Sequence, residues 1–228
     1  MKIKKVLIGM MLNVLLLSVM IVPAFASAGL GKNWKVYNVK PATSSFWDIN
    51  KLDSNGSFPI QQFVSPTTGS FAVYVLNNYN LDITGKTLTS DMSWTSGTYE
   101  TRSETCTGAY VRFEFQDVTA GRYDSNDYWW STVNLNLNAS TLGTLEASLA
   151  DRTLWTNQSG KSAIDVTENW KQWQGDIVAM SPYDGFTKAM QNVKQVGLSF
   201  GSCGYASGVA LDGKTGTFTM SDFDIITP

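Results

Sequence analysis

The chain has 228 residues, of which 17 are basic and 19 acidic, and it contains two cysteines and no histidine. The absence of histidine excludes Ser-His-Asp and Cys-His nucleophile systems and histidine-based zinc sites. The chain lacks the run of Lys or Arg residues that would indicate binding to nucleic acid or adhesion to anionic lipid.

The N-terminus has the pattern of a secretory signal peptide over residues 1–28. Three lysines precede an apolar run over residues 6–22, and small residues follow it in Ala24-Phe25-Ala26 and Ala26-Ser27-Ala28. We predict cleavage after Ala26 or Ala28 and a secreted protein, extracellular or periplasmic, with no stable membrane span afterwards. An uncleaved membrane anchor is the alternative, because residues 6–28 are just long enough to cross a bilayer.

Residues 29–228 are predicted to form one domain. Without the three signal lysines this part has 14 basic and 19 acidic residues, a net charge of −5. Its length suits an undivided sandwich or barrel. Short alternating segments separated by Gly, Asn, Asp, Ser and Pro predict strands along most of it.

The first predicted strands cover residues 71–75 and 87–94. In residues 109–118 the odd-numbered side chains from Val111 to Phe115 are apolar and the even-numbered ones are polar, so the two sets face opposite sides of a strand. In residues 129–137 the same alternation places Trp130 on the polar face.

The remaining predicted elements complete an all-β protein. A strand over residues 144–149 turns Glu146 outward, and residues 184–192 have the spacing of a short helix. Residues 193–200 and 215–226 are the last predicted strands. Many short strands and at most one or two short helices predict an antiparallel β-sandwich of jelly-roll type.

The two cysteines are predicted to form a disulfide, which is the usual state in an exported protein. Cys106 comes just before one predicted strand and Cys203 just after another. If these strands are antiparallel neighbours, the two residues lie within bridging distance. Two free structural thiols are the alternative.

The polar face shared by the strands over 109–118 and 129–137 is the predicted ligand-binding surface. Eight tryptophans are more than a core needs, and an exposed indole beside amides and a guanidinium suits a sugar: the ring packs on the C–H face and the polar groups bond the hydroxyls. We predict non-catalytic binding of a polysaccharide or other glycan, with Trp130 as the stacking platform. A buried or covered Trp130 is the competing interpretation. The predicted ligand-binding residues are Trp130, Arg112, Glu114, Gln116, Asn134, Asn136, Tyr128, Asp127 and Trp155.

Two further functions are open. A glycan-cleaving enzyme, hydrolase or lyase, would use Glu114 and Glu146, because glycoside hydrolysis needs two carboxyl groups flanking the scissile bond. A structural or cell-surface interaction protein would bury all its aromatic side chains.

No cofactor is required by any of these functions, but a structural calcium ion is compatible with the last strand. Calcium prefers several oxygen ligands together, and alternate aspartates share one strand face. The predicted ligands are Asp222, Asp224 and Asp48.

The closing segments resemble the end of jelly-roll carbohydrate-binding modules of the galactose-binding-like type. The likeness rests on residues 196–201, 208–211 and 217–225, where a hydrophobic stretch is followed by aspartate and an aliphatic residue. The resemblance implies a jelly-roll fold and a calcium role for Asp222 and Asp224. The corner from Tyr128 to Trp130 is similar to the aromatic sugar platforms of such modules.

Overall fold

The computed structural model describes residues 33–39, 48–64, 70–101, 108–117, 128–157, 162–164, 185–201 and 207–228. These residues form two sheets, called sheet A and sheet B. The main path of sheet A runs in the order β12 (Trp155–Asn157), β9 (Tyr128–Ser131), β8 (Tyr110–Gln116), β13 (Val193–Phe200), β5 (Phe71–Leu81), β1 (Trp34–Val39) and β2 (Asp48–Lys51). Sheet B runs in the order β11 (Leu142–Ser148), β6 (Thr87–Trp94), β15 (Gly216–Ile226) and β3 (Ser57–Ile60).

Four short strands and two short helices complete the described part. Within sheet A, β10 (Leu135–Asn136) pairs with β8, and β14 (Val209–Asp212) pairs with β4 (Gln62–Phe63), β5 and β7 (Tyr99–Thr101). The β4–β14 pair is parallel, and every pair along the two main paths is antiparallel. The helices are the 3-10 turn η1 (Arg152–Leu154) and the helix α1 (Gly185–Gln191).

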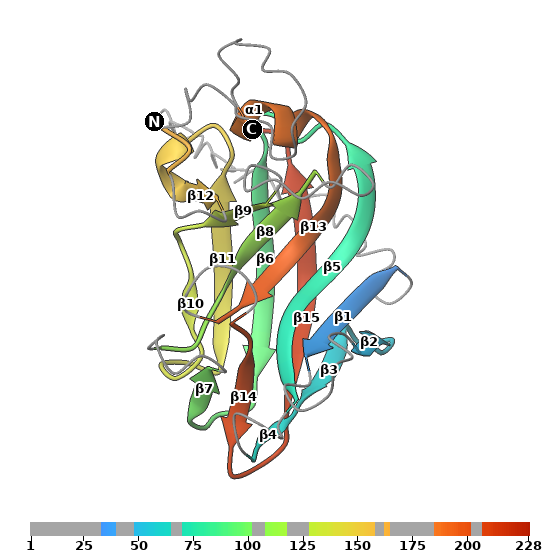
Figure 1. Cartoon of the computed structure of the whole chain (residues 1–228), viewed down its shortest axis with the longest axis vertical. Helices are drawn as coiled ribbons and strands as arrows, with labels where there is room; N and C mark the ends of the chain where they lie inside the picture. Colours follow the sequence, from blue (N-terminus) through green and yellow to red (C-terminus); the bar gives the residue numbers. More distant parts are fainter. Residues whose placement is uncertain are drawn as a thin grey trace, which may run out of the picture.

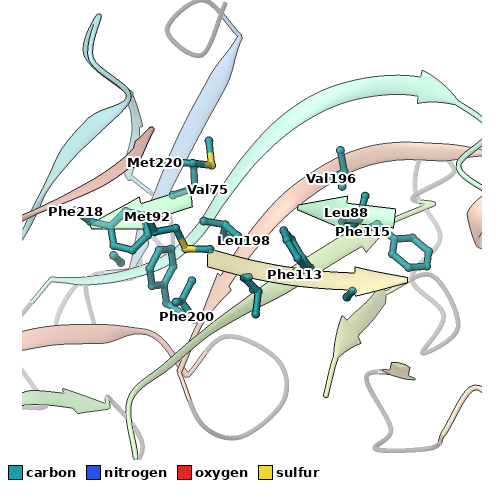
Figure 2. Close-up of a cluster of buried hydrophobic side chains, with 14 of the residues drawn as sticks. Val75, Leu88, Met92, Phe113, Phe115, Val196, Leu198, Phe200, Phe218 and Met220 are labelled. Carbon is teal, nitrogen blue, oxygen red and sulfur yellow. The ribbon is translucent and has the colours of Figure 1, made fainter. Parts of the chain in front are cut away.

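The core lies between the two sheets, as the alternation predicted. Figure 1 shows β8, β13 and β5 of sheet A crossing the strands β11, β6 and β15 of sheet B. Ring contacts join the sheets: Phe113 lies 5.8 Å from Phe223, and Phe200 lies 5.0 Å from Phe218. Figure 2 shows apolar side chains of β8 and β13 meeting those of β6 and β15 in this layer. The antiparallel β-sandwich is therefore confirmed.

The predicted helix near residue 190 is confirmed by α1, which closes one end of the core. Its apolar residues Phe186, Ala189 and Met190 are buried. The Phe186 ring lies 4.9 Å from Trp129 and 5.9 Å from Phe115. Among the described residues, no helix has the length and apolar character needed to cross a membrane.

The strand predicted over residues 129–137 is interrupted after Ser131. The Ser131 hydroxyl accepts the backbone N–H of Phe113 at 3.0 Å and donates to the carbonyl of Val133 at 2.7 Å. The hydroxyl therefore takes a position in the ladder that a backbone carbonyl would otherwise fill. The chain leaves β8 at that point and pairs with it again as β10.

The strands next to the two cysteines are antiparallel neighbours, which is the condition on which the predicted disulfide depends. Phe200 pairs with Val111, and the N–H of Gly201 donates to the carbonyl of Tyr110 at 2.9 Å. Cys106 and Cys203 themselves lie outside the described residues, as does the predicted signal peptide. Both stay predictions.

Candidate functional site

The outward face of sheet A, which points away from sheet B, contains the side chains predicted to share one face. Because Phe113 and Phe115 belong to the core, the alternating side chains of Arg112, Glu114 and Gln116 lie on the opposite side. Trp130 pairs directly with Glu114 across β8 and β9. The predicted common face of Trp130 and the polar residues of β8 is therefore correct.

The prediction that Trp130 is an exposed stacking platform is wrong. Its exposed fraction is 0%, and that of Tyr128 is 4%. Trp155 is also fully buried, but on the core side, where its ring lies 5.2 Å from Phe115 and its N–H donates to the Ser148 carbonyl at 3.0 Å. An indole has more apolar surface than most side chains. Removing that surface from water stabilises the folded protein, which favours a buried position for Trp130.

The five described tryptophans are all buried, the other three being Trp34, Trp94 and Trp129. The remaining three, at positions 47, 170 and 173, lie outside the described residues, and so does Asp127. Four of the five described tryptophans thus belong to the core, and Trp130 is buried on the outward face of sheet A.

A buried polar cluster surrounds Glu114. The Gln116 side-chain N–H donates to Glu114 Oε1 at 2.5 Å, and Arg112 Nη2 donates to the Gly201 carbonyl at 3.4 Å. Three buried polar atoms of the cluster have no hydrogen-bond partner: Glu114 Oε2, Arg112 Nε and Trp130 Nε1. Most buried polar atoms in proteins are hydrogen-bonded, so three together in one small cluster mark an unusual place.

Burial determines the charge state of this cluster. It raises the pKa of Glu114 to about 8, against the opposing effects of the Gln116 hydrogen bond, the Arg112 charge and the nearby Trp130 N–H. That N–H lies near the carboxyl group but does not have the geometry of a hydrogen bond. Burial also lowers the pKa of Arg112, opposed by Glu114 and Tyr74. At neutral pH the carboxyl group is mainly protonated, and the guanidinium keeps its positive charge because the ordinary pKa of Arg is above 12.

A second group of polar side chains lies beside this cluster, and we call it the amide strip. In register across β8, β13 and β5, Gln195 pairs with Gln116 on one side and with Asn78 on the other. Gln195 Nε2 donates to Asn78 Oδ1 at 2.9 Å and to the Tyr37 hydroxyl at 3.4 Å. The strip consists of Asn78, Asn80, Gln116, Asn192 and Gln195.

Lys194 and Asp117 join the far end of the strip into one network. Lys194 Nζ donates to Asn80 Oδ1 and to Asn192 Oδ1, both at 2.8 Å, and Asn192 Nδ2 donates to Asp117 Oδ1 at 2.7 Å. Burial raises the pKa of Asp117, while the Lys194 charge and the Asn192 hydrogen bond oppose this. Asn78, Asn80 and Asn192 are exposed, so the network lies at the surface.

Of the five residues of the amide strip, only Gln116 was predicted from the sequence to bind a ligand. The strand predicted over residues 71–75 continues as β5 to Leu81, and its outward positions after Leu76 are Asn78 and Asn80. The run Asn77-Asn78-Tyr79-Asn80 contains this alternation. Asparagine is depleted in strands, which makes such a run resemble a turn.

The remaining predicted site residues do not join this face as a group. Asn134 lies outside the strands and is exposed, and its Nδ2 donates to the Thr132 carbonyl at 3.0 Å. Asn136 pairs with Tyr110 in the β10–β8 ladder, at the opposite end of β8 from Gln116.

The predicted catalytic pair does not exist. Glu146 is exposed on β11 of sheet B, where its neighbours Leu145 and Ala147 face the core. Glu114 points away from the core on sheet A, so the two carboxyl groups lie on opposite sides of the sandwich. Stacked sheets are about 10 Å apart, and the side chains extend in opposite directions from them. The two acids cannot flank one glycosidic bond.

The predicted calcium ligands are divided between the sheets. Asp222 and Asp224 lie on β15 of sheet B, paired with Asp91 and Thr89, whereas Asp48 belongs to β2 of sheet A. Within the described ranges, no three acidic or cysteine side chains are grouped as a metal site requires. Calcium binding stays a prediction.

No protein-family model matches this chain, and a search of curated proteins finds no match.

Proposed function

We propose that this is an exported, non-catalytic carbohydrate-binding protein that binds glycan through the amide strip. The observation that carries the proposal is the group of five amide side chains, contributed by β8, β13, β5 and the turn after α1, on one face of sheet A. The proposal moves the binding surface away from Trp130, which is buried, to the adjoining strands.

The chemistry of the strip suits sugar hydroxyls. Each amide has two donors and an acceptor oxygen, and each hydroxyl also donates and accepts, so neighbouring amides can bond neighbouring hydroxyls. Hydrogen bonds between Gln195, Asn78 and Tyr37 hold these groups in place before a ligand arrives. Such preorganisation reduces the entropy lost on binding. The half-buried Tyr37 also offers an aromatic ring beside the amides.

Binding is supported over cleavage by the position of the acids. The two glutamates that the sequence offered as an acid pair are on opposite sides of the sandwich. Paired-acid hydrolysis requires both carboxyl groups at the same bond.

Affinity gel electrophoresis against a panel of soluble polysaccharides tests the proposal. We expect retardation by at least one polymer, and a loss of affinity of roughly tenfold in Gln195→Ala or Asn78→Ala, because each removes hydrogen bonds to the ligand. Asn55→Ala is the matched control, since Asn55 is an exposed amide in the turn before β3. Asn134→Ala tests the surface first predicted and should have no effect.

Two results would contradict the proposal: no retardation by any polymer, or retardation that both amide variants leave unchanged. Export is tested separately. N-terminal sequencing of protein recovered outside the cytoplasm should begin at Ser27 or Gly29, and an intact Met1 would contradict cleavage.

A further inference from the structure

We propose that the glycan bound by the amide strip is an acidic polysaccharide, whose carboxylate groups are attracted to Lys194 and to the positive charge of Arg112. This inference rests on the proposed function and specifies its ligand class.

The first argument is the division of charge between the two outward faces. The outward positions of the main path of sheet A include the cations Lys35, Lys51 and Arg112, and Lys194 lies beside them in the strip. The strands of sheet B contain no Lys or Arg, and their outward positions carry four acids. The four acids are Asp91, Glu146, Asp222 and Asp224. The face of sheet A also has the acids Asp117, which accepts a hydrogen bond from Asn192, and Glu114, which burial keeps mainly protonated at neutral pH. A polyanion is therefore repelled less by this face than by the outward face of sheet B.

The second argument is the positive charge of the buried cluster next to Gln116. Arg112 Nε is a buried N–H group without an acceptor. The Glu114 carboxyl group does not neutralise Arg112, because burial raises the pKa of Glu114 to about 8. The cluster thus has a net positive charge at neutral pH and an unused donor on Arg112. An anionic oxygen ligand is the complement of such a group.

The third argument is the position of Lys194. Two of its three N–H groups donate to Asn80 and Asn192, which orient the ammonium within the strip and leave one N–H for a ligand. A carboxylate at this point would meet a positive charge next to amides that bond the hydroxyls of the same sugar residue. Uronic-acid polymers have this combination, because each sugar residue carries both a carboxylate and hydroxyl groups.

The test compares polygalacturonate with the same polymer after full methyl esterification, which removes the charge and keeps the sugar. We expect affinity electrophoresis to show at least fivefold weaker binding to the esterified polymer. Lys194→Gln should weaken binding to polygalacturonate about fivefold to tenfold and leave binding to the ester unchanged. Lys214→Gln is the matched control, because Lys214 is an exposed lysine that donates to the Ser96 carbonyl in a turn remote from the strip. Thermal unfolding of each variant verifies the fold.

Each other outcome overturns the inference in a distinguishable way. Equal or tighter binding to the methyl ester, still reduced in Gln195→Ala, would leave the proposed function intact and refute the acidic ligand. Tighter binding to dextran sulfate than to polygalacturonate would refute the carboxylate. Equal weakening in Lys194→Gln and Lys214→Gln would mean non-specific attraction of a polyanion. Absence of retardation on every polymer would refute the proposed function as well.

Discussion

The two outward faces of this sandwich arise from the same alternating pattern but differ in what their polar side chains do. On sheet B, Glu146, Asp91 and Asp222 are exposed, and the contact between Thr144 Oγ1 and Asp91 Oδ1 at 2.5 Å joins only neighbouring strands. On sheet A, polar side chains form a network across three strands, and Glu114 is buried with Arg112 beside it. A polar outward position is therefore not enough to indicate a site. Among the described residues the two faces differ in two ways: only sheet A has hydrogen bonds between side chains that extend beyond one pair of strands, and only sheet A has buried titratable side chains on its outward face.

The largest expected difference between the faces concerns the pH dependence of stability between about pH 4.5 and pH 8. The pKa of Glu114 is about 8 in the folded protein against an ordinary value of 4.5. Between these values the folded state holds a proton that the unfolded chain has lost, so the free energy of unfolding falls as pH rises from about 4.5 to about 8. Over this range, ionisation of Glu114 in the unfolded chain lowers the free energy of unfolding by on the order of a few kcal/mol. Urea unfolding of Glu114→Gln at pH 5 and pH 9 should show a correspondingly weaker pH dependence.

Glu146→Gln on sheet B is the matched control for this measurement. Its side chain is exposed, so the variant should keep the pH dependence of the parent protein. Equal pH dependence in the parent and in Glu114→Gln would contradict the buried, protonated state of Glu114.

A smaller difference is expected for glycines of the two sheets. A Cβ at Gly197, in the centre of sheet A, would lie 1.9 Å from the backbone carbonyl oxygen of Val75. At Gly143, in the edge strand of sheet B, the nearest atom is the flexible end of Leu135, at 2.5 Å. Gly197→Ala should therefore destabilise the protein by roughly 3 kcal/mol and Gly143→Ala by less than about 1 kcal/mol. Thermal unfolding that ranks the two variants in the opposite order would contradict the packing of β13 against β5.

The smallest effect is expected on the acidic face. Asp222 pairs directly with Asp91 across β15 and β6, and like charges opposite one another destabilise a sheet. Asp222→Asn should raise the free energy of unfolding by about 0.4 kcal/mol at low ionic strength, and the gain should disappear in 1 M salt. Urea unfolding at both salt concentrations measures it. A gain that persists at high salt would show that the charges are not its cause.

Several features could be predicted from the sequence because they depend on neighbours along the chain. The alternation in β8 correctly placed Glu114 on one side and Phe115 on the other, and it placed Trp130 with Glu114. The helix near Phe186 followed from its apolar spacing. The interruption after Ser131 was not predicted, because it depends on a bond from its hydroxyl to a different strand.

The amide strip was missed because its contacts join distant parts of the chain. Lys194 and Asn80 are separated by 114 residues, and Gln195 and Asn78 by 117. These pairs meet only because β13 lies between β8 and β5. The pairing of Glu114 with Glu146 was wrong for the same reason, since alternation assigns a side chain to a face but not to a sheet.

By itself, the sequence determined which side of its strand each residue of β8 and β9 occupies, because successive side chains in an extended chain point in opposite directions. It also determined the all-β class, through the repeated short runs. Only the tertiary structure decided that Trp130 is covered, that Glu114 loses its charge and that five amides meet on one surface. Burial and strand order depend on which distant segments pack together, and local alternation contains no information about that choice.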